Sequence, residues 1–277
     1  GTSATGGTSG TGGDTGTGGT SGTGGDTGTG GTSATGGSTS AGCATDSTAR
    51  PKAIAMATTA STGPGTMTLS APGCTAPVAV AYADGRRAEV PAPSLTDFFV
   101  QIDPTNSVVW YPGVTQVVNF FSPGTGDDEE AYLAPRAGTI GSVIVEDVFP
   151  AFDAAKAHAL IEIRTGRPSD PPLPCELASD LVVSVPGHPE AVVHYLSYTY
   201  VAPNQTVAIS SGATASVAGG GLSYVSIEGI TPGDPVTFVG TKTGCKISPI
   251  KRPQVDTGKM PLVAGRVAAA RYLVGAE

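Results

Sequence analysis

The chain has 277 residues, 14% of them charged, and a formal net charge of -8 at pH 7. This sparse, acidic charge argues against a nucleic-acid partner, because nucleic-acid-binding domains carry clustered Lys and Arg. No run of 18 apolar residues occurs, so we expect no transmembrane segment in this chain.

Residues 1–42 form a low-complexity stalk rich in Gly and Thr. From residue 2 to residue 37 a six-residue unit repeats, and each copy ends in Thr-Gly-Gly. The stalk has no Leu, Ile, Val, aromatic residue or Pro to bury, so we predict a disordered spacer. Two alternatives stay open: an extended rod with O-glycosylated threonines along one edge, and repeats of neighbouring chains that order one another. Ala4 and Ala34 interrupt the glycine row, which argues against a collagen triple helix.

The rest of the chain is long enough for two domains, which we place at 43–150 and 151–277. The four cysteines are widely spaced and lack a Cys-x-x-Cys pair, which favours disulfides over a zinc site. Three connectivities are possible; we favour Cys43 with Cys74 and Cys175 with Cys245, because each bridge then stays inside one domain. Disulfides persist in oxidising compartments, so we expect an extracellular or outer-surface location.

The 43–150 segment carries short runs of Val, Ile, Thr and Tyr between Gly and Pro, a pattern typical of a mainly β fold. One helix is expected, because residues 94–97 have the form of a capping box. Phe98, Phe99 and Ile102 would bury one face of this helix, and Pro104 would end it. The acidic run 127–130 is interpreted as a solvated loop. The expected strands are 66–71, 77–83, 107–111, 115–122 and 142–148.

The 151–277 segment is expected to form a β-sandwich, because its short strands recur between turn residues. Between two of them lies Thr231-Pro232-Gly233-Asp234. Pro suits the first central position of a type II turn and Gly suits the second, where φ is positive, so we predict a hairpin. The expected strands are 157–165, 181–185, 191–201, 206–210, 213–217, 222–227, 235–241 and 265–274.

The same stretch carries a family resemblance. Residues 221–227 (Gly-Leu-Ser-Tyr-Val-Ser-Ile), 230–234 (Ile-Thr-Pro-Gly-Asp) and 236–242 (Val-Thr-Phe-Val-Gly-Thr-Lys) resemble the carboxypeptidase regulatory-like domain family. The resemblance implies a transthyretin-like β-sandwich without catalytic residues, used as an accessory, spacer or adhesive module. A Gly/Thr stalk joined to such a sandwich also resembles bacterial surface lipoproteins of myxobacterial type, which implies a lipidated cysteine upstream of Gly1.

We recognise no catalytic constellation, cofactor motif or dedicated metal motif, and we predict that the protein is not an enzyme. The tripeptide 242–244 (Lys-Thr-Gly) and the tetrapeptide 248–251 (Ser-Pro-Ile-Lys) match short signatures of serine β-lactamases. Their order is reversed, however, and Pro249 opposes the helix that the second signature requires. A metal site at His188 and His194 would need Glu190 and further ligands, whereas histidines packed among strand residues explain the same pattern.

Four aromatic residues form a candidate ligand face. Tyr198 and Tyr200 share one face of an expected strand, and Trp110 and Tyr111 lie in the other segment. Stacking of these rings on sugars would make a carbohydrate-binding surface, and aromatic packing within the β-structure is the alternative.

The sequence therefore predicts a non-enzymatic, secreted or surface-tethered structural or adhesive protein that displays β-domains on a flexible stalk. Its expected partners are the cell envelope or the extracellular matrix. One alternative is a subunit of an extracellular filament, formed by self-association through ordered repeats. Another is a carbohydrate-binding module that recognises a polysaccharide.

Overall fold

The computed structural model describes residues 43, 45–58, 60–124, 126–165, 175, 178–201, 204–209, 213, 215–216, 222–249 and 257–276. The stalk predicted at 1–42 lies outside these residues. The described part contains strands β2 to β20 and no α-helix, which confirms the mainly β class with several sheets. Since it has no helix, this part also offers no helical segment that could cross a bilayer.

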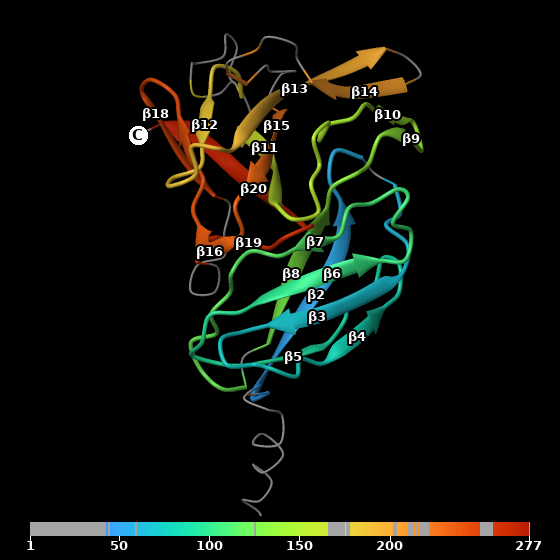
Figure 1. Ribbon diagram of the computed structural model, residues 1–277, viewed down its shortest axis with the longest axis vertical. Coiled ribbons are helices and arrows are strands. Elements are labelled where there is room, and N and C mark those ends of the chain that lie inside the picture. The colour runs from blue at the N-terminus through green and yellow to red at the C-terminus, as the bar shows by residue number, and fades with distance from the viewer. Residues whose placement is uncertain are drawn as a thin grey trace, which may run out of the picture.

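The 43–150 segment forms the lower part of the molecule in Figure 1, apart from its last two strands, which lie beside the other segment. Its strands are β2 (Ser47–Ala55), β3 (Gly65–Ser70), β4 (Ala79–Tyr82), β5 (Val90–Ala92), β6 (Phe99–Pro104), β7 (Gly113–Val114), β8 (Gly126–Leu133), β9 (Gly138–Ile140) and β10 (Val143–Val145). β5, β2 and β8 make a three-stranded sheet in which β2 is antiparallel to β5 and parallel to β8.

The 151–277 segment adds two short ribbons and half of the strands of one large sheet. Its strands are β11 (Ala157–Thr165), β12 (Val182–Ser184), β13 (Val192–Val201), β14 (Asn204–Ile209), β15 (Leu222–Ile230), β16 (Gly233–Val236), β17 (Val239–Thr241), β18 (Cys245–Pro249), β19 (Met260–Leu262) and β20 (Val267–Ala276). β12 pairs with β17, and β16 pairs with β19.

The large sheet has twelve strands and joins both segments. Its order is β4-β3-β6-β7-β20-β11-β15-β13-β14-β10-β9, and β18 also pairs with β20. The last strand, β20, is parallel to β11 along its length and parallel to β7 at its start. Strands from both sides of residue 150 thus share one sheet. The domain boundary near residue 150 stays a prediction.

The centre of this sheet is buried on both faces. Along β11 the residues from Ala157 to Ile163 are all buried, although they alternate between the two faces. Ile161 and Ile163 point into a hydrophobic cluster built from the 151–277 segment. Leu160, together with Tyr224 of β15, joins a second cluster that contains most of the core of the 43–150 segment. The polar residues of β11 are therefore enclosed between two cores.

Both disulfides form as favoured from the sequence. Cys43 is bonded to Cys74, and Cys175 is bonded to Cys245. The first bridge lies at the start of the described chain, and the second ties residue 175 to β18.

The helix expected around residues 94–104 is wrong. The amide and the hydroxyl of Ser94 donate to the carboxylate of Asp46, at 2.8 and 2.7 Å, so this serine does not cap a helix of its own. Leu95 has a left-handed backbone with φ of 58°. Val100 and Ile102 are buried while their neighbours are only partly buried, which is the two-residue period of the strand β6.

The hairpin expected at residues 231–234 is also wrong. β15 pairs with β11 and β13, whereas β16 pairs with β19. The positive φ lies at Gly229, at 77°, and Gly233 has none. The chain leaves the sheet here because both edges of β15 are already occupied by strands.

The acidic run 127–130 is part of β8 and not a loop. Its backbone pairs in parallel with β2, in a register that places Gly126 opposite Thr48 and Leu133 opposite Ala55. A count of acidic residues along one segment does not reveal a partner strand so distant in sequence.

Several strand predictions need smaller corrections. Residues 107–109 form a turn, and residues 115–122 contribute only isolated bridges at Val118 and Phe120. The expected strand 235–241 is divided between β16 and β17. Of the expected strand 213–217, the described residues 213, 215 and 216 are not in a strand.

Candidate functional site

One face of the central sheet carries an ion network across three neighbouring strands. The register places Glu162 of β11 between Arg271 of β20 and Tyr224 of β15. Oε1 of Glu162 lies 2.5 Å from Nε of Arg271 and accepts a hydrogen bond from Nε of Arg164 at 2.6 Å. Oε2 accepts a hydrogen bond from the Tyr224 hydroxyl at 3.1 Å. Both oxygens of this buried carboxylate are thus occupied.

The network reaches the other segment through Arg271. Its guanidinium lies 4.2 Å from the ring centre of Tyr132 on β8 and donates to the Tyr132 hydroxyl at 2.5 Å. Its Nη1 is also 3.5 Å from Glu130. The hydrogen bond to Glu162 is the main factor that raises the pKa of Arg164. Because the charges of this network are paired within the protein, its role is structural: it links the two segments.

A second polar group on the same face is less well satisfied. We call His158, His194, Ser226 and Glu228 the buried polar cluster, and residues 147–153 the connector. His194 faces Ser226 across β13 and β15, and His158 lies on β11 at the bulge opposite the end of β15. Each member has a buried side-chain atom without a hydrogen-bond partner in the described structure: Nδ1 of His158, Nε2 of His194, Oγ of Ser226 and Oε2 of Glu228.

Glu228 links the buried polar cluster to the connector. Its Oε1 accepts a hydrogen bond from the amide of Ala151 at 3.1 Å and lies 3.6 Å from Nε2 of His194. The Glu228 side chain is only 3% exposed, whereas the His194 side chain is 20% exposed. A buried carboxylate with one unpartnered oxygen is costly, so this position is unusual for a purely structural residue.

His158 is held among aromatic rings. Its ring stacks on Phe152 at 4.2 Å between centres, and the ring of Phe149 meets it edge-on at 5.8 Å. Nε2 lies 2.9 Å from the carbonyl of Asp153, which accepts a hydrogen bond from the imidazole. Burial lowers the pKa of His158, against an opposing effect of the hydrogen bond with Asp153. The neutral imidazole is therefore the form that the fold favours.

The two histidines of the candidate metal pair have different carboxylate partners: His194 lies near Glu228. His188 instead pairs with Glu190 at 3.1 Å, and Glu190 also accepts a hydrogen bond from the Thr231 amide. Hydrogen bonding with Thr231, its own backbone and His188 lowers the pKa of Glu190 to about 2. Within the described ranges, no group of three His, Cys, Asp or Glu side chains is placed to hold a metal ion.

The candidate aromatic ligand face is not available at two of its four positions. Trp110 and Tyr111 are 1% and 4% exposed and belong to the core of the 43–150 segment. Tyr111 packs against Phe149 and Phe152, and Arg136 lies 4.0 Å from its ring centre. Packing within the core thus accounts for both rings. The backbone of Tyr198 and Tyr200 is part of β13, and their side chains lie outside the described residues.

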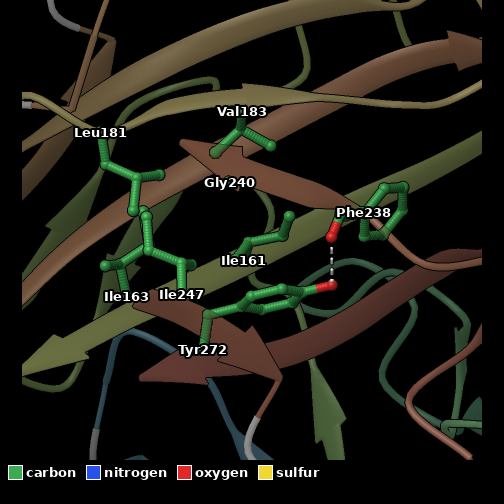
Figure 2. Close-up of a pocket in the computed structure, with 8 residues that line it drawn as sticks. All are labelled: Ile161, Ile163, Leu181, Val183, Phe238, Gly240, Ile247 and Tyr272. Carbon is green, nitrogen blue, oxygen red and sulfur yellow. Dashed lines mark hydrogen bonds between the residues drawn. The ribbon is translucent and has the colours of Figure 1, made fainter. Parts of the chain in front are cut away.

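The other face of the sheet contains a small apolar cavity (Figure 2). Its volume is about 10 Å³, and it is lined by Ile161, Ile163, Leu181, Val183, Phe238, Gly240, Ile247 and Tyr272. The Tyr272 hydroxyl donates to the carbonyl of Phe238 at 3.0 Å, as Figure 2 shows, and burial raises the pKa of this tyrosine. A space of this size holds at most one water molecule, so it is a packing defect and not a ligand site.

A larger, open pocket lies where the two segments meet. Its volume is about 330 Å³, and its lining is mostly apolar: Ser70, Ala71, Pro72, Asp97, Phe98, Phe99, Val117, Pro235 and Lys259. The carboxylate of Asp97 is held by a hydrogen bond from Nδ2 of Asn119 at 2.7 Å. The pocket has room for a small molecule.

The sequence analysis considered His194 as a metal ligand or a packed strand histidine, but it missed Glu162 and Glu228, the carboxylates at the centre of the two polar groups. Their signal was a carboxylate within an apolar strand, as in Leu160-Ile161-Glu162-Ile163 and Ile227-Glu228. A buried strand that contains Glu needs a partner for the carboxylate, and the partner comes from strands distant in sequence.

Comparison with known proteins adds no identity to this geometry. No protein-family model matches the chain, and no curated protein matches its sequence.

Proposed function

We propose that the protein is a non-enzymatic, secreted or surface-tethered structural or adhesive protein that presents a rigid β-body on the Gly/Thr stalk. The observation that supports this most strongly is the path of β20, which pairs with β7 of the first segment and with β11 and β18 of the second. A body whose last strand is enclosed by strands of both segments resists separation of its parts. That property suits a module that bears load or makes contacts at a surface.

The two disulfides support the same proposal. The Cys43–Cys74 bridge fixes the chain directly after the stalk, and the Cys175–Cys245 bridge closes a long loop of the second segment. Bonds of this kind are retained in oxidising surroundings, which fits an extracellular location. The resemblance to carboxypeptidase regulatory-like domains and to stalked lipoproteins suggests attachment to the cell envelope through a lipid upstream of Gly1.

The filament subunit stays the main rival proposal. The carbohydrate-binding module has less support, because burial of Trp110 and Tyr111 leaves neither ring free to stack on a sugar. The mostly apolar pocket beside Phe99 is one place in the described structure where a small ligand would fit.

A display experiment tests the proposal. The full chain and a variant lacking residues 2–37 are produced in the native cell, each with the same epitope at the end of the chain. We expect both bodies to unfold at the same temperature, and we expect the shortened variant to bind less antibody on intact cells. Equal antibody binding by both, or regular filaments of the native protein in electron micrographs, would contradict surface display of single chains.

Intact-mass measurement of the native protein adds a direct check. An upstream lipid and glycans on the stalk threonines would each change the mass by a defined amount. A mass that corresponds to the unmodified chain in the culture medium would restrict the proposal to a secreted form.

A further inference from the structure

The buried polar cluster joins parts of the chain that are far apart in sequence. Glu228 is at the end of β15, His194 is on β13, and the connector leads from the first segment into β11. Glu228 is the residue that contacts both of the others, because its Oε1 accepts from the Ala151 amide and lies 3.6 Å from His194. A change in the charge of His194 would therefore act on the attachment of the connector.

We propose that Glu228 and His194 form a proton-operated latch, which fastens the connector to the central sheet more tightly when the surroundings become acidic.

With neutral His194, the carboxylate of Glu228 is buried beside an amide donor and no paired cation. A buried carboxylate in this state weakens the fold, because it has lost its hydration without a compensating charge. When His194 takes up a proton, both of its ring nitrogens become donors and the ring carries a positive charge. At 3.6 Å from Oε1, a small rotation of the ring brings Nε2 into a charge-assisted hydrogen bond.

The latch has access to protons. The His194 side chain is 20% exposed, in contrast to the 3% of Glu228, so the imidazole reaches solvent while its partner does not. Because the charged pair exists only in the folded chain, the latch contributes to stability only while His194 carries a proton.

Other titratable and charged groups lie on the elements around the latch. They are Asp147 and Asp153 on the connector, Tyr111 and Arg136 from the first segment, His158 and Lys156 at the start of β11, and the pair His188 and Glu190 beside Thr231. Of these, only the two histidines ordinarily titrate between about pH 5 and 8.

The two neighbouring histidines act differently from His194. Burial lowers the pKa of His158, so acidification destabilises the fold at that position. His188 pairs with Glu190 at the surface, where an ion pair contributes little to stability. His188 therefore provides a matched control, since its replacement also removes one histidine next to one glutamate.

The test uses the full chain with its disulfides intact. The unfolding temperature is measured at about pH 8 and about pH 5.5 for the wild type, His194→Gln and His188→Gln. We expect His194→Gln to lower the unfolding temperature by about 2 to 4 °C more at the acidic pH than at the alkaline pH. We expect His188→Gln to lower the unfolding temperature by nearly the same amount at both pH values.

The same measurement in a protein that already carries Glu228→Gln tests whether Glu228 is the partner of His194. In Glu228→Gln, the replacement of His194 by Gln is expected to have the same effect at both pH values, because the carboxylate that the imidazolium needs is gone. A pH-dependent effect of His194→Gln that persists in this background would overturn the latch. An effect of His194→Gln that is equal at both pH values in the wild type would overturn it as well.

Hydrogen exchange of the unaltered protein keeps the test valid if a variant fails to fold. The amide of Ala151 is the connector group bonded to Glu228. After correction for the intrinsic rate, we expect its protection to increase several-fold between about pH 8 and about pH 5.5. Unchanged or reduced protection of Ala151 on acidification would contradict the proposal.

Discussion

Both faces of the central sheet pack against hydrophobic clusters, but one of them also carries a buried ion network. On one face, Ile161 and Ile163 of β11 pack with apolar residues of the 151–277 segment around the small cavity in Figure 2. On the other face, Glu162 is bound to Arg164, Arg271 and Tyr224. Consecutive residues of one strand thus belong to a non-directional apolar core and to a directional ion network.

This difference shows what each face contributes. Apolar packing yields most of the stability and tolerates changes of partner, since it depends mainly on volume and area. The ion network requires particular partners at particular registers, because an unpaired buried charge is costly. The polar face therefore specifies how the first segment is aligned on the sheet, and the apolar face stabilises the sheet itself.

The largest expected effect comes from the apolar face. Ile161 is 1% exposed and borders the cavity, so Ile161→Ala removes buried methyl groups and enlarges an existing void. We expect a loss of about 3 to 4 kcal/mol in the free energy of unfolding, measured with urea. The control Ile161→Val should lose about 1 kcal/mol. Equal losses for the two variants would show that this face relaxes around a void.

The next largest effect is expected from a change at Glu162, the residue that follows Ile161 in β11. Glu162→Gln keeps the shape of the side chain but leaves Arg164 without its anion and leaves Arg271 with only Glu130, at 3.5 Å. Since the arginine side chains are 21% and 45% exposed, solvent reduces the cost, and we expect a loss of about 2 to 3 kcal/mol.

The control for Glu162→Gln is a change at Arg164, the more exposed of its two arginine partners. Arg164→Gln should cost less than about 1 kcal/mol, because Glu162 keeps its contact with Arg271. If Arg164→Gln were as harmful as Glu162→Gln, the network would depend on the exposed arginine, and the proposed role of Arg271 as the inner partner would be wrong.

The contrast between the two faces also explains how much of the fold could be predicted from the sequence. β11 was predicted with its observed bounds, because a run of apolar and β-branched residues marks a buried strand whatever surrounds it. The disulfide pairs were predicted because only three arrangements exist and this one keeps each bridge inside one predicted domain.

Three of the failures involve partners distant in sequence. Ser94 has the local pattern of a helix cap, yet its hydrogen bonds go to Asp46. The acidic run of β8 pairs with β2 in a register that no local pattern contains. The contact between Glu228 and His194 was missed for the same reason, since these residues come together only when β13 and β15 pair.

A smaller effect is expected at one of the polar contacts within the apolar face. The Tyr272 hydroxyl donates to the Phe238 carbonyl, and both residues are buried. Tyr272→Phe removes the donor and leaves the carbonyl without it, so we expect a loss of about 1 kcal/mol in urea unfolding. A variant as stable as the wild type would mean that another donor reaches this carbonyl, and the apolar face would then be more adaptable than its packing suggests.

The smallest expected effect is a pH dependence on the polar face. Burial lowers the pKa of His158, so the folded state binds fewer protons at this residue than the unfolded state does. Its contribution is therefore complete above the ordinary histidine pKa of about 6.5 and decreases as the pH falls through that value. His158→Gln keeps a donor for the Asp153 carbonyl but does not titrate, so the wild type should lose stability relative to this variant on acidification. Urea unfolding of both proteins at about pH 8 and about pH 5.5 measures the difference.

A gain in stability of the wild type relative to His158→Gln on acidification would mean that His158 is charged in the fold. Two neighbouring histidines, and not His194 alone, would then pair with Glu228 in acid.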